Sequence, residues 1–189
     1  MKKFPERALI IQDRINELTA ENHLSSLFGS QGFIERSEKI ADWMNLAGLE
    51  TSVDNIGNIR GKLKSNNQAA KTFLIGSHFD TGIYDDKNAG ILGILIGLDI
   101  IENIKQQQTQ LPFNIELIAF AEEEGTRFNY NYLGSKVVAG NFENKLLLLK
   151  DEINNSLADV LHSLHFDSEK IKEDAVIAED ILGYFEIHS

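Results

Sequence analysis

Cysteine is absent from this chain of 189 residues, and so is any apolar run long enough to cross a membrane. Without cysteine the protein can form neither a disulfide framework nor a thiolate zinc site, and this composition fits a reducing cytoplasm. The longest apolar stretch, residues 90–101, contains Asp99 and is shorter than a membrane-spanning helix. Residues 1–5 are followed by charged residues rather than by the apolar segment of a signal peptide. We therefore expect a soluble, cytoplasmic protein.

An excess of positive charge is also missing. The chain carries 18 Lys and Arg against 29 Asp and Glu, a net charge of -11. Such a charge is repelled by nucleic acids and by anionic membranes, so we expect neither as a partner. The length and the hydrophobic content of 42% suit a single globular domain with a sizeable core. We expect one domain over residues 1–189.

Apolar spacing alternates between the helical and the extended period along the chain. Helical spacing covers residues 7–18, 34–49, 88–105, 132–139 and 157–164, and strand-like runs cover residues 50–53, 58–63, 72–77, 114–120 and 182–187. The turn at residues 54–57 separates the first two strands. Strands that alternate with helices predict an α/β fold, a three-layer sandwich with a mostly parallel central sheet.

Side chains that can bind metal ions follow three of the predicted strands. His78 and Asp80 follow the first of these strands, residues 122–124 (Glu-Glu-Glu) follow the second, and His188 closes the third. Open α/β sheets place their active sites at the carboxyl ends of their strands. The sequence therefore predicts a metal site at this edge of the sheet.

Each of these residue types also has a simpler interpretation. A ligand histidine commonly donates its second ring N–H to a carboxylate, which suits His78 and Asp80, but the pair also fits a hydrogen-bonded histidine and a helix-capping aspartate. The three adjacent carboxylates at residues 122–124 repel one another unless a bound cation relieves the repulsion, and one of them can then act as a general base. The alternative interpretation of this segment is a solvated run of charges. For His188 the alternative is a frayed terminal residue.

Four segments in order resemble one known family. They read DNIGNIRG at 54–61, GSHFDT at 76–81, EEEGTRF at 122–128 and GYFEIH at 183–188. They are similar to those of the zinc-dependent amidohydrolases that include N-carbamoyl-amino-acid hydrolase, ureidopropionase and allantoate amidohydrolase, relatives of aminoacylases and carboxypeptidases. The resemblance implies a metallohydrolase catalytic domain that cleaves the C–N bond of small carbamoyl or ureido substrates with a metal-activated water.

The resemblance also implies a role for each matching residue. His78 resembles the first zinc ligand, and Asp80 resembles the catalytic residue that supports it. Glu123 is similar to the general base, Glu124 to a ligand of the second metal, and His188 to a further metal ligand. The implied cofactor is Zn²⁺, although such a ligand set also accepts Mn²⁺, Co²⁺ or Ni²⁺.

Two departures from the family pattern limit these expectations. The position of the family's bridging carboxylate is Ala89 here, and a methyl group binds no cation. Asp85 or Asp86 is a candidate replacement, but a turn or a helix N-cap also suits them. Family members are roughly twice as long, so we expect a truncated catalytic domain, incomplete and without the lid or dimerisation domain, that binds one ion or none.

Three hypotheses for the function follow from these departures. The first is a truncated amidohydrolase-like protein with weak or no activity. The second is a chain that becomes active only when another polypeptide complements it. The third is a non-catalytic binding or interaction domain. Because the missing strands would leave an apolar sheet edge exposed, we expect a homo-oligomer that forms through this edge.

Overall fold

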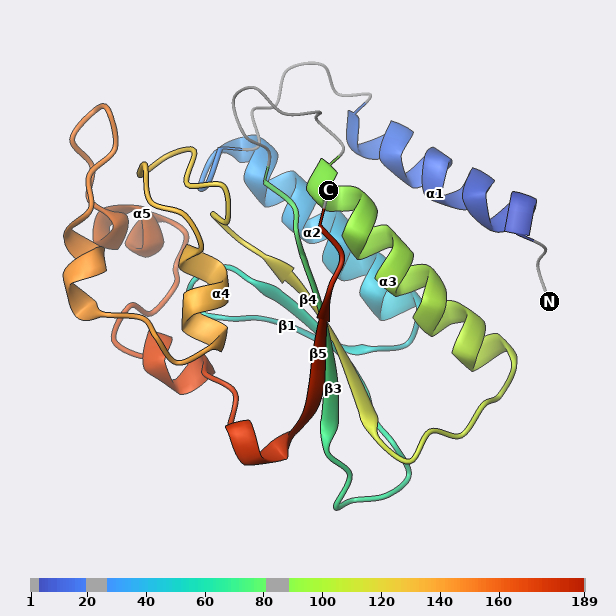
Figure 1. Ribbon diagram of the computed structural model, residues 1–189. Helices are drawn as coiled ribbons and strands as arrows, with labels where there is room; N and C mark the ends of the chain where they lie inside the picture. Colours follow the sequence, from blue (N-terminus) through green and yellow to red (C-terminus); the bar gives the residue numbers. More distant parts are fainter. Residues whose placement is uncertain (1–3, 20–26, 81–88, 189) are drawn as a thin grey trace.

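The computed structural model describes residues 4–19, 27–80 and 89–188 (Figure 1). The helices in these ranges are α1 (Phe4–Thr19), α2 (Gln31–Leu46), α3 (Ala89–Gln106), α4 (Leu133–Val138) and α5 (Leu157–Ser163). The strands are β1 (Glu50–Val53), β2 (Ile59–Leu63), β3 (Thr72–His78), β4 (Asn114–Phe120) and β5 (Ile181–Glu186). Short 3-10 segments lie at Asn144–Leu148, Ile171–Asp174 and Ala178–Asp180. Each helix and strand therefore overlaps the segment that the apolar spacing predicts.

Local signals in the sequence explain where several helices begin and end. The Ser30 side chain accepts a hydrogen bond from the Phe33 N–H and so caps α2. α2 ends just before Gly48, whose φ of +73° is the left-handed conformation in which glycine closes a helix. α5 begins with a capping box, in which Ser156 and Asp159 each bind the backbone N–H of the other.

The five strands form one mixed sheet in the order β1-β2-β4-β3-β5. β3 pairs in parallel with both β4 and β5, whereas β2 is antiparallel to β1 and to β4. Of the five strands in the described residues, β1, β3, β4 and β5 thus run in one direction and β2 runs against them, so the prediction of a mostly parallel sheet is confirmed only in part. Parallel neighbours require a crossover connection, and the turn at 54–58 and the loop at 64–71 are too short to provide one.

Apolar side chains from both faces of the sheet are covered. On one face Ile75 of β3 and Leu117 of β4 belong to the main core with α2 and α3. On the other face Leu74, Ile118 and Phe120 pack against Val138 of α4. Helices thus lie on both sides of β3 and β4, as Figure 1 shows for α3 and α4. This packing fixes the carboxyl ends of the two central strands.

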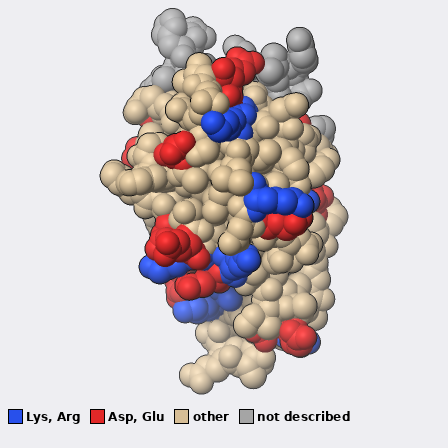
Figure 2. Space-filling model, turned by 90° about the vertical axis from the view of Figure 1, so that its left-hand side faces the viewer, with Lys and Arg blue, Asp and Glu red and all other residues tan. Residues whose placement is uncertain are grey.

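Charges of both signs are mixed on the surface. On the face drawn in Figure 2, Lys and Arg side chains lie beside Asp and Glu side chains and do not form a continuous basic surface. In the part of the chain that the structure describes, no helix combines the length and the apolar character that crossing a membrane requires.

Candidate metal centre

The carboxyl ends of β3, β4 and β5 meet at one edge of the sheet. His78 is the last residue of β3 and pairs in register with Phe120, the last residue of β4. On the other side of β3, Gly76 pairs with Glu186, and its carbonyl accepts a hydrogen bond from the Ile187 N–H at 3.0 Å. The parallel pairing therefore brings the acidic segment after β4 and the histidine after β5 to the two sides of His78.

His78 is a buried histidine held in a fixed orientation. Its Nδ1 lies 3.0 Å from the backbone oxygen of Asp80 and 3.3 Å from the Asp80 Oδ1. The other carboxylate oxygen of Asp80 accepts a hydrogen bond from the Glu124 N–H at 2.9 Å. Burial alone would lower the pKa of His78, but Asp80 and Glu124 outweigh it, so this pKa is raised. Asp80 thus connects the imidazole to the acidic segment.

Three metal-binding side chains converge beside this histidine. The His78 Nε2 lies 3.5 Å from the Glu124 Oε1, which is 3.7 Å from the His188 Nε2. The two imidazole rings are 5.0 Å apart between centroids. One ligand atom from each of the three residues lies within 4.8 Å of the others. The structure therefore brings His78, Glu124 and His188 together in one cluster, whereas the resemblance implied that Glu124 binds a second metal.

The His78 Nε2 supports the fit of a cation to this cluster. This buried nitrogen has no hydrogen-bond partner among the described residues, although its neighbour Nδ1 is bound. A buried nitrogen that faces a carboxylate and a second imidazole is satisfied by a cation at that point. Two histidine nitrogens and one carboxylate oxygen are a donor set that suits Zn²⁺.

Glu123 is the buried neighbour of this cluster. Its carboxylate accepts hydrogen bonds from the Ser135 hydroxyl at 2.5 Å and from the Ser135 N–H at 3.2 Å. Burial raises the pKa of Glu123 to about 7, the hydrogen bonds from Ser135 oppose this rise, and the charges of Asp80 and Glu186 add to it. A carboxyl group with a pKa near neutrality can accept and return a proton at physiological pH.

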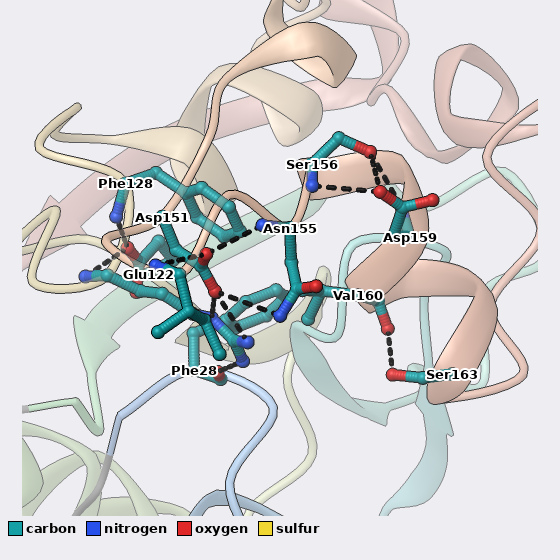
Figure 3. Close-up of polar contacts among 11 residues, drawn as sticks. Phe28, Glu122, Phe128, Asp151, Asn155, Ser156, Asp159, Val160 and Ser163 are labelled. Carbon is teal, nitrogen blue, oxygen red and sulfur yellow. Dashed lines mark hydrogen bonds and ion pairs between the residues drawn. The ribbon is translucent and has the colours of Figure 1, made fainter.

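Glu122 is not one of the three side chains of the metal-binding cluster. Its side chain accepts hydrogen bonds from the backbone N–H groups of Arg127 and Phe128, and Figure 3 shows it beside Phe128 and Asp151. Its φ of +49° turns the chain sharply after β4. Glu122 and Glu123 are 0% and 3% exposed, so a fully solvated charge run is the wrong interpretation of this segment.

Ser135 is a residue whose role the sequence did not reveal. It lies at the start of α4, and its hydrogen bonds to Glu123 join this helix to the acidic segment. The available signal was a serine at a helix start shortly after a carboxylate cluster, which is too common a pattern to assign a partner. The candidate replacements Asp85 and Asp86 lie outside the described residues. Ala89 is the first residue of α3.

Comparison with known proteins finds relatives that are named as allantoate deiminases and N-carbamoyl-L-amino-acid amidohydrolases. The chain is 35% identical over 176 residues to a probable allantoate deiminase of Oryza sativa subsp. japonica, which covers 89% of this chain and 35% of that protein. It is 30% identical over 187 residues to an N-carbamoyl-L-amino-acid amidohydrolase of Pseudomonas sp. (strain NS671), with 97% and 45% covered. No family model matches the chain.

Solved structures share the fold. The chain superposes on AtUAH in complex with glyoxylate with a TM-score of 0.87 at 26% identity, over 96% of this chain and 45% of that one. A hydantoinase/carbamoylase family amidase from Burkholderia ambifaria gives a TM-score of 0.83 at 24% identity, over 97% and 45%. The chain thus spans less than half the length of each of these relatives.

Proposed function

We propose that this chain, which belongs to the family of allantoate deiminases and N-carbamoyl-L-amino-acid amidohydrolases, binds one divalent metal ion through His78, Glu124 and His188. The chain matches only a part of each of these relatives. The observation that supports this proposal most directly is the buried His78 Nε2, which has no hydrogen-bond partner in the described part of the chain and faces the other two side chains. Zn²⁺ is the preferred ion, with Mn²⁺, Co²⁺ and Ni²⁺ as further candidates for this donor set.

The chain's own residues prepare this site for hydrolysis. A bound cation would supply Lewis-acid chemistry that activates a water molecule and polarises a carbonyl group. Asp80 fixes the His78 ring, and Glu123, with a pKa of about 7, serves as the proton acceptor. The substrate class that we propose is a small N-carbamoyl or ureido compound with a C–N bond to be cleaved.

We further propose that this chain alone hydrolyses such substrates weakly or not at all. Within residues 4–19, 27–80 and 89–188, the structure contains a single group of three side chains that could hold an ion. Ala89 provides no carboxylate to bridge a second ion. One alternative is activity that depends on a second polypeptide, and the other is a non-catalytic binding domain.

A calorimetric titration with zinc tests the metal site. We expect binding near one equivalent for the unmodified chain, and its loss in His78→Ala. His162→Ala is the matched control, because His162 is an exposed histidine of α5 outside the cluster. Absence of specific binding, or equal binding by His78→Ala, would contradict the proposal.

Activity assays separate the three functional hypotheses. We expect the zinc-loaded chain to release little product from N-carbamoyl amino acids or allantoate. Rapid turnover by the chain alone would refute weak activity. A gain of activity in Ala89→Asp would indicate that the missing bridging carboxylate causes the weak activity. Activity that only an added second polypeptide restores would support complementation.

We also propose that the chain self-associates through the outer edge of β5. In the described residues β5 pairs only with β3, so its other edge presents unpaired backbone groups. Leu182, Tyr184 and Phe185 of this strand are each about half exposed, and Leu182 and Tyr184 line an apolar groove of about 510 Å³. Pairing of two β5 edges would cover these side chains in both copies.

Light scattering across a concentration series tests this association. We expect a dimer that dissociates in Leu182→Lys, because the new charge would be buried at the paired edge. Leu148→Lys serves as the control, since Leu148 is an exposed leucine of a different segment. A monomer at all concentrations would contradict this proposal.

A further inference from the structure

Asn58 lies in the turn before β2 and binds the backbone at two places far away in the sequence. Its side-chain Oδ1 accepts a hydrogen bond from the Ala121 N–H at 2.9 Å, and its Nδ2 donates to the Gly134 carbonyl at 3.1 Å. The Gly134 N–H in turn donates to the Ala121 carbonyl at 3.1 Å. One fully buried amide thus joins the end of β4 to the start of α4.

Asp54 holds this amide in its orientation. Its Oδ2 accepts a hydrogen bond from the Asn58 Nδ2 at 2.8 Å, and its Oδ1 accepts one from the Asn58 N–H at 2.9 Å. The Asp54 N–H donates to the Asn58 carbonyl at 3.0 Å. These bonds fix which end of the amide faces Ala121 and which faces Gly134.

The two backbone groups that Asn58 binds flank the acidic segment and its partner. Ala121 lies two residues before Glu123, and Gly134 directly precedes Ser135, which donates two hydrogen bonds to Glu123. Between them, the N–H groups of 132 and 133 donate to the carbonyls of Glu123 and Glu122. Together with the bond from the Gly134 N–H to the Ala121 carbonyl, these two bonds form a short backbone ladder between residues 121–123 and residues 132–134. The Asn58 amide bridges the two sides of this ladder at the end that Ala121 and Gly134 form.

We propose that Asp54 and Asn58 are positioning residues for the metal centre, which hold the acidic segment against α4 so that Glu123 and Glu124 keep their places beside His78. This inference rests on the proposed function and gives the DNIGN turn a role in it. The amide is the sole side-chain link that the structure records between this turn and the two segments in the described part of the chain. Its removal would leave the buried Ala121 N–H without this partner and would take one hydrogen bond from the Gly134 carbonyl.

The same turn contains a matched control. Asn55 also carries an amide, but it binds Asp174 and the Asp167 N–H rather than the acidic segment. Asn55→Ala therefore removes comparable hydrogen bonds from the same turn without touching the ladder. Asn58→Ala and Asn55→Ala are compared under conditions in which both proteins are folded.

Two readouts test the proposal. Amide hydrogen exchange reports the ladder directly, and we expect about tenfold faster exchange at Tyr132, Leu133 and Gly134 in Asn58→Ala, relative to amides of α3. Zinc titration reports the site, and we expect about tenfold weaker binding in Asn58→Ala. Asn55→Ala should change neither the exchange ratio nor the zinc affinity.

The outcomes distinguish this inference from the proposed function. If the unmodified chain binds no zinc, the metal proposal fails, and hydrogen exchange alone decides whether Asn58 holds the ladder. Unchanged exchange in Asn58→Ala would overturn the positioning role. If exchange accelerates while zinc binding by Asn58→Ala equals that of the unmodified chain, Asn58 stabilises the fold locally but does not position the site.

Discussion

Removal of the Ser135 hydroxyl should raise the pKa of Glu123 well above neutrality. This hydroxyl donates to the Glu123 Oε1 at 2.5 Å and so favours the ionised carboxylate. A hydrogen bond to a charged group contributes roughly 1.5–3 kcal/mol. One pKa unit corresponds to about 1.4 kcal/mol, so Ser135→Ala should raise the pKa from about 7 by about one to two units. The remaining N–H of residue 135 is the weaker contact, at 3.2 Å.

Carbon-13 NMR of glutamate carboxyl groups measures this pKa in zinc-free protein. Ser163→Ala is the control, because the Ser163 hydroxyl donates only to the Val160 carbonyl on α5, as Figure 3 shows. The control should leave the pKa of Glu123 at its original value. A pKa that stays unchanged or falls in Ser135→Ala would refute the assignment of Ser135 as the group that keeps Glu123 ionisable near neutrality.

Three further predictions concern stability and binding. Burial raises the pKa of Asp54 to about 6, so the folded state holds its proton longer than the unfolded state. The free energy of unfolding should therefore fall by about 2 kcal/mol more between pH 4 and pH 6 than it does in Asp54→Asn, as measured by urea titrations, and an equal fall in the two proteins would contradict this. Zinc affinity should keep rising with pH above about pH 6.5, because the pKa of His78 is raised and protons then compete with zinc for its imidazole. Calorimetry at several pH values measures this affinity, and an affinity that does not change with pH would contradict the prediction. Gly134→Ala should lower unfolding free energy by about 1–3 kcal/mol, because its Cβ would overlap the Asn58 amide; urea unfolding equal to the parent would contradict this.

The sequence predicted the α/β fold and the end of the sheet at which the candidate ligands gather, whereas the roles of these residues stay predictions. His78, Glu124 and His188 could be nominated because each follows an apolar strand, and the parallel pairing of β3 with its neighbours brings such positions together. The expectation of a mostly parallel sheet did not allow for β2, which runs against the other four strands of the described structure. Strand alternation suggested parallel pairing, although the short connections around β2 permit only a reversal of the chain.

Other features of the site depend on contacts that no sequence pattern specifies. A run of three glutamates reads as solvated surface, but the left-handed turn at Glu122 directs its carboxylate to the Arg127 and Phe128 amides and leaves Glu124 beside His78. The hydrogen bonds from Asn58 to Ala121 and Gly134 span more than 60 residues of sequence. Such pairings follow from the assembled sheet, so local spacing does not reveal them.

The position of β5 at the sheet edge would couple metal binding at the proposed site to the attachment of this strand. His188 follows a strand that is held in the described structure by its ladder to β3, whereas His78 is a buried residue at the end of β3, which pairs with a strand on each side. If the end of β5 detaches, a cation bound at the proposed site would lose one of its three ligands. By thermodynamic linkage, an ion that prefers the complete site would in turn shift the opening equilibrium of this strand toward the attached state. A bound ion would then stabilise the pairing of the outermost strand, β5, with β3.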